Sequence, residues 1–156
     1  MATRKKRATE RPFIEAQLEQ LMMFSEHAQM VETSEPRKVS GQVKANLSSQ
    51  VGLGLSQNAG AQQRLQINFQ LSLTLQQVGA DLPICTYSNE FRGTFEVIEF
   101  RGIDPEFISA EAAQTYISQV EWIARSRAVS TITMLGLRGV ALPKPEKFRS
   151  NELRDA

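Results

Sequence analysis

Residues 65–75 read Leu65-Gln66-Ile67-Asn68-Phe69-Gln70-Leu71-Ser72-Leu73-Thr74-Leu75, with a large apolar residue at each odd position and a polar residue at each even one. Side chains alternate between the two faces of a β-strand, so this spacing gathers the apolar side chains on one face; on a helix they would spread around the circumference. The segment is therefore predicted to be a long strand, buried on one face and wet on the other, as in antiparallel sheets.

Two further strands are expected, one on each side of this segment. In residues 39–55 the odd positions are again mostly non-polar, and Gly52 and Gly54 indicate a bulge or a strong bend in that strand. Turn chemistry separates the strands at residues 58–60 and 79–83. The third strand carries its large apolar residues at one parity: Tyr87, Phe91, Phe95 and Val97. Three successive strands with short turns predict an antiparallel meander.

The segment 13–31 is compatible with two structures. Helical spacing is found for Phe13, Ile14, Leu18, Leu21 and Met22. The succession Met22-Met23-Phe24 instead fits an edge strand, so the sequence leaves the choice between helix and strand open. A break follows at residues 34–36, because Pro36 restricts the residue before it to extended geometry.

After Asp104-Pro105 the apolar period changes from two to that of a helix. Ser109 is a candidate N-cap. An apolar face follows at i, i+3, i+4, i+7 spacing and reaches Gly136, through Ala113, Tyr116, Ile117, Val120, Ile123, Ala124, Val129, Ile132 and Leu135. The spacing predicts an amphipathic helix of up to about 25 residues that covers one sheet face, with a kink or break near Arg125–Arg127. Strands first and a helix last predict an α+β domain.

The composition fits a single domain of 156 residues, with a body at 13–148 and short tails at 1–12 and 149–156. Both tails are basic; the expected role of residues 1–12 is a disordered, solvated tail, and nucleic-acid binding is not favoured, because the body lacks interleaved basic and aromatic residues. Cys85 is alone, so no internal disulfide forms and a buried position is expected. No stretch approaches the roughly 18 apolar residues of a membrane span, and no secretory signal follows the basic start, so the cytoplasm is the expected location.

Residue types that perform catalysis or bind metals are sparse. His27 is the single histidine, has no second histidine or cysteine to coordinate with, and is expected at the surface. Asp81 and Asp104 lie beside prolines in turns, where aspartate caps the backbone. No nucleophile elbow, phosphate loop or Cys-x-x-Cys motif is present. We therefore expect no enzyme, no catalytic residue, no metal and no cofactor.

The apolar surface is larger than one helix can cover. Tyr116, Trp122 and Met134 fall beside the main apolar stripe of the predicted helix. An isolated sheet with such a helix is expected to self-associate, for instance with the helices of two copies sandwiched between two sheets.

Residues 39–148 resemble the SecB family of export chaperones. The resemblance rests on Cys85-Thr86-Tyr87, on Gly93-Thr94-Phe95-Glu96-Val97, on Ile123-Ala124-Arg125 with Val129, and on the exit Leu137-Arg138-Gly139-Val140-Ala141-Leu142-Pro143-Lys144-Pro145-Glu146-Lys147-Phe148. It implies a four-stranded antiparallel sheet of meander or Greek-key type, followed by a long helix on one face. Residues 13–24 would then form the first strand and 29–38 the crossover to the second.

In function, the resemblance implies an ATP-independent holdase that binds unfolded or nascent polypeptides in apolar grooves and assembles as a dimer of dimers. Flexible, methionine-containing apolar surface suits such promiscuous binding. The expected client-binding residues are Met22, Met23, Phe24, Met30, Val31, Val43, Leu47, Tyr116 and Trp122. The expected oligomer interface consists of Ile117, Val120, Ile123, Ala124, Val129 and Ile132.

Two departures from the family pattern concern its partners. Export members dock on the translocase motor ATPase through an acidic patch and a metal-binding tail; here Thr86 stands where an acid is expected, and residues 149–156 contain no Cys or His. The expected clients are export substrates or antitoxins, the latter as for solitary SecB-like chaperones. The alternative is a non-catalytic adaptor that uses the same sheet and helix only for assembly.

Overall fold

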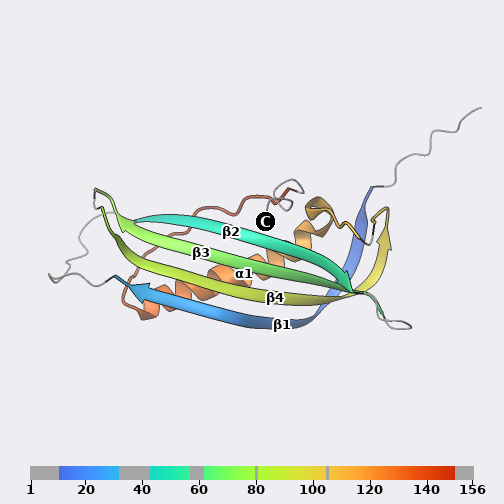
Figure 1. Cartoon of the computed structure of the whole chain (residues 1–156), viewed down its shortest axis with the longest axis horizontal. Coiled ribbons are helices and arrows are strands. Elements are labelled where there is room, and N and C mark those ends of the chain that lie inside the picture. Colours follow the sequence, from blue (N-terminus) through green and yellow to red (C-terminus); the bar gives the residue numbers. More distant parts are fainter. Residues whose placement is uncertain (1–10, 32–42, 57–61, 80, 105, 150–156) are drawn as a thin grey trace, which may run out of the picture.

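The computed structural model describes residues 11–31, 43–56, 62–79, 81–104 and 106–149. The elements follow one another as β1 (Phe13–Met30), β2 (Val43–Ser56), β3 (Arg64–Gln77), β4 (Pro83–Arg101) and α1 (Ala110–Met134). The strands form one antiparallel sheet in the order β1-β4-β3-β2, and α1 lies across one face of it (Figure 1). This confirms the predicted α+β class.

The topology combines the two predicted alternatives. Strands β2, β3 and β4 form a meander of hairpins, and β1 pairs with β4, which completes a Greek-key order. The register from Val43↔Gln77 to Ser56↔Arg64 is unbroken, so the bulge expected at Gly52 and Gly54 is not found. Residues 39–42, which were expected to begin this strand, lie outside the described residues.

The core lies between the sheet and α1. All six apolar side chains of the alternating segment in β3 are buried, and their partners on β4 share the same face, as in Leu65↔Phe95 and Phe69↔Phe91. Cys85 is fully buried among them, as expected. The viewer of Figure 1 looks at the opposite, polar face, with α1 behind the sheet.

The 18-residue strand β1 settles the open choice for residues 13–31. Its pairing with β4 shifts register between Glu15 and Ala16, between Leu18 and Gln20, and between Met23 and Ser25. Each shift can exchange the faces of the residues that follow, because side chains alternate at a period of two. The apolar residues of β1 therefore do not follow a single period of two along the whole strand. The strand also includes Gln29 and Met30, which the family resemblance assigned to the crossover; residues 32–38 lie outside the described residues.

Helix α1 begins where the sequence indicated. The Ser109 hydroxyl accepts a hydrogen bond from the Ala112 N–H at 3.3 Å, and Gly136 leaves the helix with a φ of 93°. The helix continues without interruption through Arg125–Arg127, so the break expected there is not found.

Close contact between helix and sheet depends on Gly93 of β4. A Cβ atom at this position would lie 2.7 Å from Val120 Cγ2 and 2.9 Å from Phe95 Cε2, so any side chain must push α1 or the Phe95 ring away. We expect Gly93→Ala to lower the free energy of unfolding by about 1–3 kcal/mol through overpacking, measured by urea denaturation. Gly54→Ala is the matched control, because an added Cβ meets no atom within 4 Å there. Equal stability of the two variants would contradict this role of Gly93.

Candidate functional site

An apolar cavity of about 700 Å³ lies along the side of α1 that the sheet leaves free. Two of its apolar side chains are well exposed, with 70% of Trp122 and 73% of Met134 accessible to solvent. The lining residues are Trp122, Arg125, Ser126, Val129, Ser130, Thr133, Met134 and Leu142. Exposed apolar surface of this kind, rimmed by polar residues, is typical of binding surfaces.

Two hydroxyl groups of the cavity wall are turned back onto the helix. Ser126 Oγ donates to the Trp122 carbonyl at 2.8 Å, and Thr133 Oγ1 donates to the Val129 carbonyl at 2.7 Å. These bonds occupy the hydroxyl protons. The wall therefore presents mainly carbon to a ligand between Trp122 and Met134.

The opposite wall is the chain segment that follows the helix. Residues 140–149, here called the strap, leave the end of α1 and run back along it on the β2 side (Figure 1). Leu142 of the strap lines the cavity, and the Pro143 carbonyl accepts a hydrogen bond from Arg125 Nη2. On the same side of the helix, Glu121 is buried; burial raises the pKa of its carboxyl, and Arg125 counteracts that rise.

A second apolar surface lies on the edge strand β1. Met22, Met23 and Phe24 are 44%, 45% and 49% exposed, and the guanidinium of Arg92 lies 4.5 Å from the centre of the Phe24 ring. Met22 pairs with Arg92 and Met23 with Phe91, so successive side chains of β1 point to opposite faces of the sheet. The edge strand thus offers apolar side chains on both faces.

The structure distributes the other expected client-binding residues unevenly. Met30 is 38% exposed, whereas Val31, Val43 and Leu47 are half-buried. Tyr116 belongs to the core: its hydroxyl donates to the Ile14 carbonyl and accepts from the Ala16 N–H, both at 2.8 Å. This residue fastens the start of β1 to α1 and offers little surface to a ligand. Of the expected set, Trp122 alone lines the cavity beside α1.

The expected oligomer-interface residues divide in a similar way. Ile117, Val120, Ala124 and Ile132 are at most 1% exposed, because the sheet of their own chain covers them. They have no surface left for a partner. Ile123 is half-buried and Val129 is 38% exposed, and Val129 lines the cavity. Sequence spacing identified the buried stripe of α1 correctly but did not say which surface covers it.

Six of the eight cavity residues were not among the expected site residues: Arg125, Ser126, Ser130, Thr133, Met134 and Leu142. The sequence analysis places Met134 beside the apolar stripe, Arg125 at an expected kink and in the family resemblance, and Leu142 in that resemblance, but none of them in a site. The available signal was the spacing Trp122, Ser126, Val129 and Thr133, which puts these residues on one helix face. The strap contribution had no sequence signal, since it depends on the chain doubling back.

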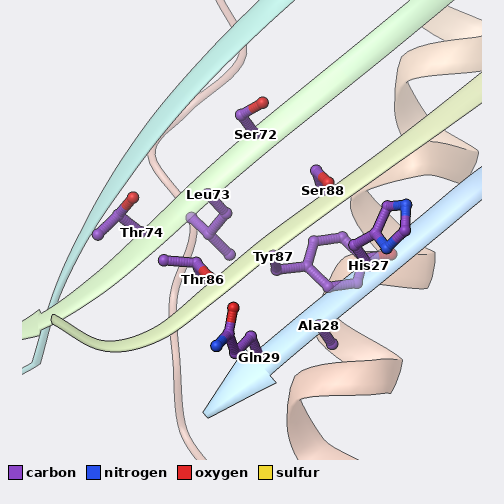
Figure 2. A pocket seen from close by; sticks show the side chains of 9 residues that line it. All are labelled: His27, Ala28, Gln29, Ser72, Leu73, Thr74, Thr86, Tyr87 and Ser88. Atoms are coloured by element: carbon purple, nitrogen blue, oxygen red, sulfur yellow. The ribbon is translucent and has the colours of Figure 1, made fainter. Parts of the chain in front are cut away.

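A polar hollow of about 470 Å³ lies on the other face of the sheet. Figure 2 shows side chains from β1, β3 and β4 around it, with His27 beside Ser88 and Gln29 beside Thr86. The lining groups are hydroxyls, an amide and an imidazole, without a carboxylate. Over the described ranges, no three His, Cys, Asp or Glu side chains gather closely enough to hold a metal ion.

One ionisable cluster ties β1, β4 and α1 together. The Glu26 carboxylate accepts hydrogen bonds from Arg127 Nε and Nη2 at 2.8 Å each, from the Tyr87 hydroxyl at 2.7 Å and from Thr131 Oγ1 at 3.0 Å. The bonds from Arg127 contribute most to lowering the pKa of Glu26 to about 2. Burial, together with the Glu26 carboxylate, raises the pKa of Tyr87 to about 12. Asn89 Nδ2 extends the cluster to the Ala124 carbonyl.

This cluster stabilises the fold in a pH-dependent way. Because the pKa of Glu26 is about 2 in the folded chain and ordinarily 4.5, its contribution is complete above pH 4.5 and is lost as the pH falls towards 2. We expect Glu26→Gln to lower the free energy of unfolding at pH 7 by about 1.5–3 kcal/mol and to flatten its decline below pH 4.5. Urea denaturation at pH 7, 4.5 and 3 measures both.

Glu19→Gln is the control for the Glu26 substitution. Glu19 pairs with Arg64 at 2.7 Å, but both side chains are exposed and the pair is screened by solvent. Little change is expected at pH 7. A Glu26→Gln chain with the stability and acid sensitivity of the unsubstituted protein would contradict the assigned role.

Comparison with solved structures identifies a similar fold. The SecB-like chaperone of Mycobacterium tuberculosis, solved in complex with a ChAD peptide from the HigA1 antitoxin, has a TM-score of 0.60 at 14% identity over 83% of this chain and 90% of that chain. A protein of unknown function from Streptococcus agalactiae has a TM-score of 0.45 at 12% identity, over 84% of this chain and 98% of that one. No family model and no curated protein matches the sequence. The chain has a SecB-like fold.

Proposed function

We propose that this protein is an ATP-independent chaperone that holds unfolded or nascent polypeptides without chemical turnover. The observation that carries the proposal is the apolar cavity beside α1, where Trp122 and Met134 expose 70% and 73% of their surface. An unfolded client offers apolar side chains in no fixed arrangement. A methionine thioether adapts its shape to such partners, and an indole provides a large apolar surface.

The edge strand would provide a second contact surface for the same client. Met22, Met23 and Phe24 lie on both faces of β1 and are each close to half exposed. The SecB-like chaperone with a similar fold was solved with a peptide bound, which supports a polypeptide as the partner here. An antitoxin and an export substrate are the two client classes proposed. Docking on an export motor ATPase is not favoured by the sequence, because Thr86 stands where export members carry an acid.

The part of the chain that the structure describes contains no helix long and apolar enough to cross a bilayer. The cytoplasmic location expected from the sequence remains a prediction.

The chaperone is proposed to act as a homo-oligomer, a dimer of dimers. Exposed apolar residues remain on α1 and on β1 after the single chain has folded, and association would cover part of them. We expect light scattering to give a mass near four times the chain mass of 17.5 kDa. A monomer at micromolar concentration would contradict the proposed oligomer. It would also contradict the alternative adaptor function, which consists only of assembly.

Trp122 is the single tryptophan of the chain and reports directly on the cavity. We expect a reduced, unfolded client without tryptophan to shift the Trp122 emission to shorter wavelength, because the exposed indole becomes covered. Met134→Ser is expected to weaken client binding by about tenfold or more, since a buried methionine side chain contributes about 1.5–3 kcal/mol, and to reduce the suppression of client aggregation.

Val78→Ser is the matched control for Met134→Ser. Val78 is 65% exposed but lies in the turn after β3, outside the cavity. This variant should bind and protect the client like the unsubstituted chain. An assembled particle that neither shifts its emission nor suppresses aggregation would contradict the chaperone proposal and favour the adaptor.

A further inference from the structure

The strap is packed onto the core as an extended segment. Val140, Leu142 and Phe148 are half-buried against the core cluster, and the Phe148 ring meets Phe69 of β3 edge-on, with ring centres 6.0 Å apart. It lies on the β2 side of α1 (Figure 1), where the inner-face residues of β2 other than Val51 are only partly buried. The strap therefore covers apolar sheet surface beside the helix.

Two side chains of α1 contact the strap through its backbone. Gln114 Oε1 accepts a hydrogen bond from the Phe148 N–H at 3.0 Å, and Arg125 Nη2 donates to the Pro143 carbonyl. The Gln114 amide is itself oriented by a bond from its Nε2 to Ser118 Oγ at 3.2 Å. Backbone groups are the same in every sequence, so Gln114 and Arg125 can hold an extended segment whatever its side chains are.

The Arg125 guanidinium retains further binding capacity. Its Nη1 is buried and has no hydrogen-bond partner among the described residues. Arginine carries five N–H donors in a planar fork, so it can hold two carbonyl oxygens side by side. The strap satisfies one of these positions through Pro143. An extended chain with a differently placed carbonyl could satisfy the second.

Two prolines keep the strap from joining the sheet. Pro143 and Pro145 lack a backbone N–H and fix their φ angles, which prevents regular pairing with a neighbouring strand. The strap accordingly forms no strand. A segment held by side-chain contacts and by Phe148, without a hydrogen-bonded ladder, can leave its place without breaking the sheet.

We propose that the surface beneath the strap, between α1 and the β2 side of the sheet, is a peptide-binding groove. The strap occupies this groove in the free protein, and an extended client segment displaces it. The groove takes a peptide with two large apolar residues spaced as Leu142 and Phe148, held at its backbone by Gln114 and Arg125. This inference rests on the proposed chaperone function and specifies the class of segment that the client presents.

Competition with the strap has a measurable consequence. A tethered segment acts at an effective concentration in the millimolar range. If the groove is free for about 1–10% of the time, the apparent Kd for an added peptide is raised about 10- to 100-fold. A substitution that weakens the contacts of the strap with the rest of the chain should therefore tighten the binding of a peptide. A substitution in a surface that contacts the peptide directly would instead weaken its binding.

The test uses the full chain and a labelled peptide with the strap sequence, residues 140–149, followed by fluorescence anisotropy. Phe148→Ala should bind the peptide at least about 10-fold more tightly than the unsubstituted chain. Lys147→Ala, an exposed change in the same segment, should bind like the unsubstituted chain. Adding Gln114→Ala to Phe148→Ala should weaken peptide binding again, because the client would lose the bond to its backbone.

A second measurement needs no substitution. In the unsubstituted chain, amide hydrogen exchange at Phe148 should accelerate when the peptide is added, because displacement frees the N–H that Gln114 now accepts. If Phe148→Ala binds no more tightly, or Phe148 exchange is unchanged by saturating peptide, the strap is a fixed part of the fold and the inference is overturned. Failure of the unsubstituted chain and of Phe148→Ala to protect any unfolded client would contradict the proposed function instead.

Discussion

The architecture depends on the contact between one helix and the two central strands. The α1 helix approaches β3 and β4 closely because Gly93 provides no side chain and because alanines, including Ala113, Ala124 and Ala128, face the sheet. A single helix is too narrow to cover four strands. The helix does not cover most of the inner face of β2 or much of β1. The apolar side chains that remain exposed on the chain result from this incomplete cover. The groove, the strap and the apolar edge strand are consequences of one sheet with one helix.

Sequence reasoning succeeded where one period governs a whole element. The alternation in β3 and the spacing in α1 were sufficient for the fold class, the helix cap at Ser109 and the buried stripe. It left β1 open, because three register shifts mix the two faces within one strand. The candidate cavity was anticipated only in part: Trp122 was among the expected client-binding residues, but the cavity wall also includes Leu142, which is brought to α1 by the return of the strap. A contact that forms because the chain reverses direction produces no periodic pattern in the sequence.

The polar contacts divide the molecule into a fixed part and a loosely held part. In the fixed part, Glu26 joins three elements through four hydrogen bonds near the end of β1, and Tyr116 fastens the start of β1. Along the strap, helix side chains contact the backbone and few apolar groups are covered completely. A binding surface that must accept many sequences gains from such a division, because the scaffold keeps its shape while the covering segment can move.

The irregular pairing of β1 has a consequence for solubility. An exposed edge strand of 18 residues with apolar side chains on both faces is the kind of surface on which chains stack into cross-β fibrils. Fibril growth needs a long, flat and regularly spaced row of free amide and carbonyl groups. The three register shifts interrupt that row and increase its local twist, so no long flat stretch of β1 is available as a template. The register shifts that obscure the apolar period of β1 in the sequence therefore also oppose polymerisation of the protein along this exposed edge.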